Sequence, residues 1–217
     1  MTDVSGSLVR FALSGGASVP DGLRSAVSGL PVAPAGPVQH QESMRSGYPQ
    51  KDLRADVLDA AAGLTRSGMH PLVAATAAVA GLRNGTRAEE ATVLGCEIAC
   101  RLAASLDVRP DALAVVGAAL AGSTEPVGGL HALGLAATQT TTVGGSSEDD
   151  EEEIAALRAA FAAADGAEAA LLGERGFTAP RQPLEGRRGL LALLAPEADP
   201  QELVRDLGTR WFAEAVI

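Results

Sequence analysis

The chain is poor in aromatic side chains and has fewer basic than acidic residues. Its 217 residues include one Trp, one Tyr and four Phe, and 17 basic residues stand against 27 acidic ones, which gives a formal net charge of −10 at pH 7. A surface of this charge repels phosphate backbones, and so few aromatic rings cannot form a row of platforms for stacked bases. We therefore expect no nucleic-acid partner.

Long apolar runs are also missing. The longest nearly uncharged runs, Leu72 to Leu82 and Leu113 to Ala121, are shorter than the roughly 18 residues that span a bilayer. The first twenty residues carry one basic side chain, Arg10, and lack the extended apolar core of a signal peptide. We expect a cytoplasmic protein that has no membrane partner.

Motifs for metal, nucleotide and nucleophile chemistry are absent as well. Cys96 and Cys100 share one face of a predicted helix, but no His or further Cys lies nearby to complete a zinc site, so we expect two small buried residues. The acidic run Glu148 to Glu153 lacks the central glycine of a calcium loop. No Lys follows a second glycine as in a phosphate-binding loop, and neither Gly-x-Ser-x-Gly nor His-Glu-x-x-His occurs. We expect no cofactor and no metal.

The sequence does have a strong helical pattern. Hydrophobic residues make up 47% and charged residues 20%, which suits a folded chain. From Asp52 to Gly208 apolar residues recur at spacings of three and four, without strand alternation. The clearest helix follows a Thr86-x-x-Glu89 capping box and carries an apolar face of Ala91, Leu94, Ile98, Leu102 and Leu106. The sequence predicts an all-α helical bundle in a single domain over residues 1–217, with an irregular, linker-like stretch at 29–50.

Start and stop signals predict where the other helices lie. Asp52 can cap a helix that ends at Gly68, and Pro71 suits the first position of a helix that runs to Asn84. The acidic run suits a helix N-terminus, because carboxylates there meet the positive end of the helix dipole. We expect further helices from Pro110 through Leu120, from Val127 to Ala137, from the acidic run to Gly176, and from Asp199 to Gly208.

Three histidines are the candidates for acid-base chemistry. His40 lies in the irregular stretch and His131 in an apolar helical pattern, where we expect a hydrogen-bonded structural residue. His70 directly precedes Pro71 at a predicted helix start, where a side chain can face a cleft between helix ends. Because an imidazole titrates near neutral pH, His70 is the candidate catalytic residue; the alternative is a residue that only begins a helix.

Four blocks of sequence stand in order along the chain: His70-Pro71 before an Ala-rich helix, Gly95-Cys96-Glu97 to Arg101-Leu102, His131 to Gln139, and Gly176-Phe177-Thr178-Ala179-Pro180 followed by Leu184-Glu185-Gly186-Arg187-Arg188-Gly189. These blocks resemble the MmgE/PrpD family, whose members include 2-methylcitrate dehydratase and cis-aconitate decarboxylase. Leu207-Gly208-x-Arg210-Trp211 is similar to the end of the family's helical domain, and Leu8 to Leu30 resembles its first helices more weakly.

This resemblance implies a large all-α domain and a smaller α/β lid, with the active site between them. It implies a metal-free lyase that acts on small carboxylic acids by removing a proton beside a carboxylate. The chain stops where the lid would begin, so we expect the helical domain alone.

The sequence departs from the family at most of the expected catalytic positions. Ala60 to Leu64 stands in place of an Asp-Asp-Thr-like run, and Asp107 to Asp111 stands where a second active-site histidine is expected. The acidic run 148–153 replaces a segment that contains a lysine. Of these groups only His70 is retained.

Two hypotheses about function follow, and the sequence leaves open whether the chain is an enzyme. In the first, it is a truncated, degenerate helical domain, a pseudoenzyme that acts by forming a homo-oligomer or a complex with a complete family member. In the alternative, it is a lyase or isomerase that acts on a small carboxylate by acid-base chemistry around His70, with Arg66, Arg83 or Arg101 holding the anion. A scaffold or small-molecule binding protein is a third class.

Overall fold

The computed structural model describes residues 3–13, 19–30, 53–140 and 151–217. All regular secondary structure in these ranges is helical, and no strand is present in them, so the all-α prediction is confirmed. The α-helices are α1 Val4–Leu13, α2 Asp21–Val27, α3 Leu53–Arg66, α4 Pro71–Asn84, α5 Ala88–Leu106, α6 Ala114–Gly122, α7 Pro126–Ala137, α8 Glu151–Glu174 and α9 Leu190–Leu194. Short 3-10 helices occupy Gly85–Arg87, Pro110–Leu113, Pro200–Leu203 and Ala213–Ala215.

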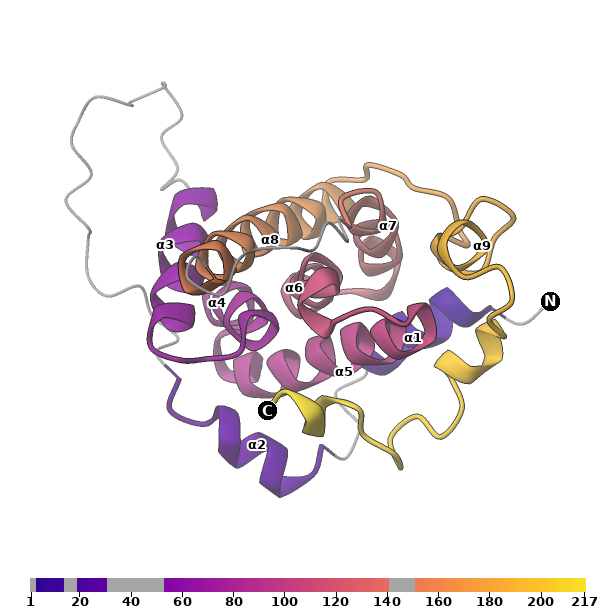
Figure 1. Ribbon diagram of the computed structural model, residues 1–217. Helices are drawn as coiled ribbons and strands as arrows, with labels where there is room; N and C mark the ends of the chain where they lie inside the picture. The colour runs from indigo at the N-terminus through magenta and orange to yellow at the C-terminus, as the bar shows by residue number, and fades with distance from the viewer. Residues whose placement is uncertain (1–2, 14–18, 31–52, 141–150) are drawn as a thin grey trace.

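Helix α6 is the centre of the bundle. Every one of its residues is buried, and its sequence Ala-Val-Val-Gly-Ala-Ala-Leu-Ala-Gly contains no polar side chain. Figure 1 shows α4, α5, α7 and α8 around it, and each of these helices contacts it. A helix that is apolar on all sides is stable only inside such a ring.

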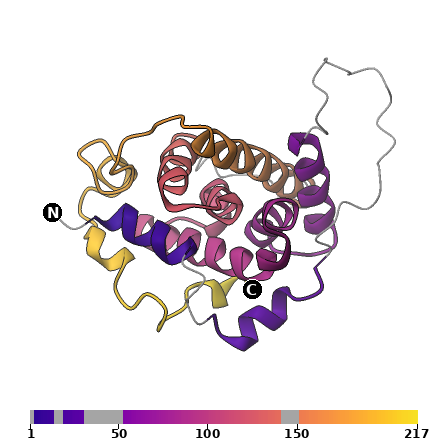
Figure 2. The ribbon, with the colours of Figure 1, turned by 180° about the vertical axis from the view of Figure 1, so that it is seen from behind.

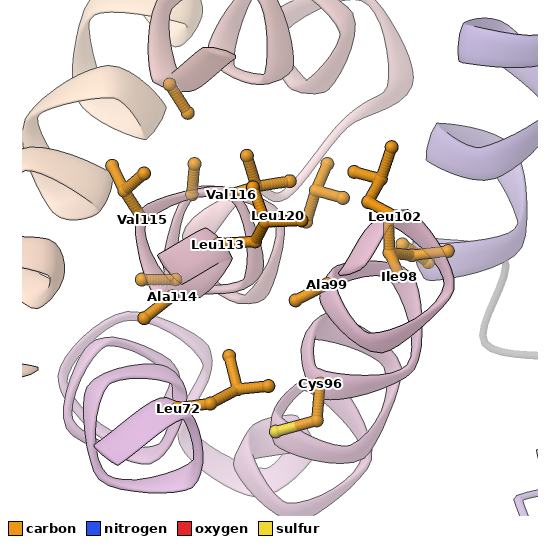
Figure 3. Packing of buried hydrophobic residues seen from close by; sticks show 14 of the residues in the cluster. Leu72, Cys96, Ile98, Ala99, Leu102, Leu113, Ala114, Val115, Val116 and Leu120 are labelled. Atoms are coloured by element: carbon orange, nitrogen blue, oxygen red, sulfur yellow. The ribbon is translucent and has the colours of Figure 1, made fainter. Parts of the chain in front are cut away.

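Small side chains allow these helices to approach closely. A Cβ atom on Gly95 of α5 would lie 2.5 Å from the carbonyl oxygen of Gly117 of α6, so only glycine fits at this crossing. Larger residues fill the space beside it, among them Leu72 of α4, Ile98 of α5 and Leu120 of α6 (Figure 3). The scarcity of bulky side chains is therefore offset by short distances between helices.

The two ends of the described chain cover one side of α5. Helix α1 and the C-terminal segment both lie near α5, which the view from behind in Figure 2 also shows. The rings of Phe11 in α1 and Trp211 stand 5.8 Å apart, and Trp211 is buried. Helix α2 also contacts α5.

Most predicted helix boundaries agree with the structure. Gly68 has φ +91°, the left-handed conformation expected after a helix end, and Pro71 is the first residue of α4. Helices α4 and α7 end at Asn84 and Ala137, as predicted. Helix α8 ends at Glu174, two residues before Gly176.

Three local predictions were wrong. The Thr86-x-x-Glu89 pattern does not cap α5: Thr86 lies inside a 3-10 turn, and Arg87, at the N-cap position, makes no side-chain cap. Pro110 begins a 3-10 turn that leads into α6 rather than the helix itself. The last predicted helix is a 3-10 turn at Pro200–Leu203 followed by irregular chain, although Asp199 does cap it.

Some predictions lie outside the described residues, namely those on Asp52, His40, most of the stretch 29–50 and the acidic residues before Glu151. Helix α8 begins at Glu151, so the second half of the acidic run does stand in a first turn. None of the described helices is both long enough and apolar enough to cross a membrane.

Candidate functional site

His70 lies at the N-terminus of α4 and caps that helix. Its backbone is extended, with φ −56° and ψ 132°, and its Nδ1 accepts a hydrogen bond of 3.2 Å from the backbone N–H of Leu72. Pro71 follows at the first helical position, where a missing N–H is not needed. One imidazole nitrogen of the candidate catalytic residue is thus used by the fold, and no residue in the described part of the chain forms a hydrogen bond with Nε2.

The neighbours of His70 come from the segment where the resemblance places a second histidine. Burial lowers the pKa of the half-buried His70, the charge of Asp111 raises it, and the charge of Arg109 lowers it. Arg109 binds Asp111 through two hydrogen bonds, Nε to Oδ1 at 3.1 Å and Nη2 to Oδ2 at 3.2 Å. The Asp111 side chain is 8% exposed. An arginine-carboxylate pair therefore stands beside His70 where a second imidazole was expected.

The acidic run also reaches this side of the bundle. Glu153, in the first turn of α8, forms an ion pair with Arg66 at the C-terminus of α3, with Nη2 and Oε2 3.1 Å apart. Arg66 precedes His70 by four residues, across the turn between α3 and α4. The guanidinium group that the alternative hypothesis assigned to a substrate carboxylate is bound to a carboxylate of the protein.

Arg83 stands at the other end of α4 from His70. Its Nη2 lies 2.7 Å from Oε2 of Glu174, and its Nε donates to the carbonyl of Gly122. Because α4 rises about 1.5 Å per residue, the two ends of its 14 residues lie roughly 20 Å apart. Arg83 therefore ties α4 to α6 and α8 and is far from His70.

Arg101 is buried and serves the fold. Its Nε donates to Oε1 of Glu97, one turn earlier in α5, over 2.6 Å. Its Nη1 and Nη2 donate to four carbonyls of the C-terminal segment, those of Leu203, Arg205, Asp206 and Arg210. Oε2 of Glu97 accepts hydrogen bonds from the backbone N–H groups of Phe212 and Ala213. The Gly-x-Glu to Arg-Leu block thus holds residues 203–213 against α5.

The two cysteines are buried, as expected. Cys96 contacts the hydroxyl of Thr76, with Sγ and Oγ1 3.1 Å apart, and burial raises the pKa of its thiol. Burial, with a smaller contribution from Glu97, raises the pKa of Cys100 to about 12. Both thiols are therefore protonated at neutral pH and poor nucleophiles. Within the described ranges, no three His, Cys, Asp or Glu side chains come together as metal ligands would.

A large surface cavity lies elsewhere and is lined by residues of α1, α7 and α9. It has a volume of about 1050 Å³, and much of its wall is residues 180–190, from the block that most resembles the family. Within that block, Glu185 accepts hydrogen bonds from the backbone and the hydroxyl of Ser5 at the start of α1. Gly134 of α7 touches Ala179 so closely that a Cβ there would clash. These contacts bring three distant segments together.

The sequence analysis did not single out the charged residues of this cavity. Arg181, Arg187 and Arg188 line it, together with Arg10 of α1. Three arginines within eight residues of an acidic chain were the available signal. His131 also lines the cavity, and its Nδ1 accepts a 3.0 Å hydrogen bond from the backbone N–H of Ala179. The prediction that His131 is hydrogen-bonded is confirmed.

The comparisons with known proteins point to one family. A family model described as the MmgE/PrpD N-terminal domain matches residues 54–203, more than half of the chain. The matched span contains all four blocks of the resemblance, the first of which begins at His70, whereas α1 and Leu207–Trp211 lie outside it. A comparison with curated proteins gives no match.

Proposed function

The chain belongs to the MmgE/PrpD family, and from that premise we propose that its helical domain does not by itself catalyse the lyase reaction. We propose that it acts by associating with a second copy of itself or with a complete family member. The first part of the proposal rests on the charges around His70, and the second on exposed apolar residues of α8.

The observation that carries the proposal is the pairing of the arginines near His70. A lyase acting on a small carboxylic acid needs a base and unoccupied cationic groups that hold the substrate carboxylates. Arg109 is bound to Asp111, and Arg66 is bound to Glu153. A substrate carboxylate would compete with a carboxylate of the protein at both positions, in ion pairs that lie at the surface. This arrangement favours a domain that has lost substrate binding.

Two exposed apolar side chains support the association. Leu157 and Phe161 lie one turn apart on α8 and are 49% and 54% exposed. Residues four apart on a helix share a face, so these two form one apolar area on the outside of the bundle. Exposed apolar areas of this kind commonly mark a protein interface.

One observation favours the alternative function. Burial lowers the pKa of His70, so its imidazole is neutral at neutral pH, as a general base requires. Asp111 stands beside it, and its carboxylate could stabilise the imidazolium formed when His70 takes a proton. In this second candidate function, the chain is a lyase or isomerase that uses His70 as the base.

An activity assay separates the two candidates. We expect the purified chain, assayed without a partner, not to turn over 2-methylcitrate or cis-aconitate even when the chain is present at high concentration. If turnover is found, the variants His70→Asn and His70→Ala decide its origin. Asn at an N-cap accepts the same backbone hydrogen bond as His70 but cannot take a proton at neutral pH. Loss of activity in both variants would establish the alternative and refute the first part of the proposal.

Sedimentation tests the association. We expect the chain to be oligomeric at micromolar concentration, or to recover a family member in a pull-down from its native cell. Phe161→Glu should abolish that association, whereas the matched variant Glu168→Gln, an exposed change on the same helix, should not. A monomer at all concentrations, with no family member recovered, would refute this part of the proposal.

A further inference from the structure

The cavity between α1, α7 and residues 180–193 is distinct from the surroundings of His70, which does not line it. Its volume of about 1050 Å³ is at the upper end of the range of small-molecule sites, roughly 300–1,000 Å³. No property of the cavity depends on whether the chain is catalytic.

Four arginines and one carboxylate, that of Asp3, are the charged groups that line the cavity. Arg10 is paired with Asp3, with Nη1 and Oδ2 3.3 Å apart. For Arg181, Arg187 and Arg188, no carboxylate among the described residues forms an ion pair with the guanidinium group. In a chain of net charge −10, three arginines without such partners on one wall form a local positive field, which attracts an anion.

His131 adds a further donor to the same cavity. Because its Nδ1 accepts from the backbone of Ala179, the proton of the neutral ring is on Nε2. No described residue accepts a hydrogen bond from that nitrogen. Arginine guanidinium groups and an imidazole N–H together suit a carboxylate, which only accepts hydrogen bonds.

Most of the remaining cavity wall is apolar. Leu130 and Leu190 contribute to it, and Val127 and Leu193 stand at its open side with 67% and 68% of their surfaces exposed. Large aliphatic side chains left this exposed in a concave site are stabilised when a ligand covers them. A ligand with a carboxylate group but no apolar part would leave this apolar surface exposed to water.

We propose that this cavity binds an amphiphilic carboxylate, a molecule with one carboxylate group and an unbranched apolar chain. The carboxylate lies against Arg187, Arg188 and the Nε2–H of His131, and the chain covers Val127, Leu130 and Leu193. A small ligand is favoured over a second copy of the protein, because the site is a concave cavity of about the volume of small-molecule sites.

Titration calorimetry with laurate, below its micelle concentration, tests the proposal. We expect saturable binding of one laurate per chain, and no binding of dodecyltrimethylammonium, which has the same chain length and the opposite charge. Arg187→Gln/Arg188→Gln should weaken laurate binding about a hundredfold, because it removes two charge-assisted hydrogen bonds and each one lost costs about a factor of ten. The single variant Leu193→Asp should also weaken laurate binding, because it removes apolar surface and adds a negative charge that repels the carboxylate.

A matched control separates the cavity from net charge. Arg24→Gln/Arg175→Gln removes the same total charge from exposed residues that do not line the cavity and should leave laurate binding unchanged. Equal weakening in this control, equal binding of the cationic amphiphile, or no saturable laurate binding would each overturn the proposal. It would also be overturned if the chain is a dimer that Leu193→Asp converts to a monomer, because the cavity is then an interface. None of these results depends on the assays with 2-methylcitrate or cis-aconitate.

Discussion

Replacing Arg101 with Met should weaken the attachment of the C-terminal segment to the helical bundle. Arg101 makes five hydrogen bonds, one to Glu97 and four to carbonyls between Leu203 and Arg210. Its side chain is 1% exposed and that of Glu97 is not exposed at all. Methionine fills a similar volume but donates nothing, so Arg101→Met leaves the Glu97 carboxylate buried without its cation.

The magnitude follows from that burial. Removing one partner of a buried ion pair costs about 3–5 kcal/mol of unfolding free energy, because the other charge stays buried. Glu97 keeps two backbone N–H donors, from Phe212 and Ala213, so we expect a value near 3 kcal/mol. For a chain of this size each kcal/mol lowers the melting temperature by about 2–4 °C. Arg101→Met should therefore melt about 6–12 °C below the wild type.

Urea denaturation followed by far-UV circular dichroism measures this loss, with Arg205→Met as the matched control. Arg205 pairs with Glu202 on the surface, and such pairs contribute about 1 kcal/mol or less. The double variant Glu97→Gln/Arg101→Met should lose less than the sum of its two single variants, because the charges are removed together. If Arg101→Met is no less stable than Arg205→Met, the buried pair does not hold the C-terminal segment.

Three further perturbations have outcomes that the structure determines. Gly95→Ala should lower the free energy of unfolding by about 1–3 kcal/mol, because the new methyl group meets the carbonyl of Gly117. Gly63→Ala should stabilise α3 by about 0.5–1 kcal/mol, because a Cβ on Gly63 has no other atom within 4 Å. The same urea titration measures both changes. The lowered pKa of His70 means that the unfolded chain binds a proton more readily, so stability should fall as the pH drops below the ordinary histidine value of about 6.5. His70→Asn should reduce that loss in melting curves recorded between pH 5 and 7, and an unchanged slope would contradict it. In gradients of protein concentration, Phe161→Glu should shift sedimentation toward the monomer.

Local chemistry explains why most helix starts could be predicted. Pro71 fixes its own φ and lacks the N–H that a first helical residue does not need, so His70-Pro71 marks the start of α4 without any tertiary contact. Gly68 likewise marks the end of α3 through its left-handed conformation. The capping box at Thr86 failed because a 3-10 turn at Gly85–Arg87 precedes α5 and places Thr86 one residue before the N-cap position, which Arg87 occupies.

The surroundings of His70 could be predicted only in part. The sequence identified the segment Asp107 to Asp111 as the place where a second histidine is missing. That Asp111 approaches His70 and is bound by Arg109 depends on the packing of the 3-10 helix Pro110–Leu113 against α4 and α5. Sequence patterns record spacing along one helix and carry no information about which segments meet.

The all-α fold, the buried face of α5 and the membership of the family follow from the order of residues along the chain. These properties depend on helical periodicity and on motifs in which neighbouring residues act together. Only the tertiary structure decided that residues 203–213 do not continue a helix, because Arg101 and Glu97 bind their backbone groups from about a hundred residues away. It alone also decided that Arg10, His131 and Arg187 share one cavity. Both outcomes depend on contacts between segments far apart in sequence, which no local pattern encodes.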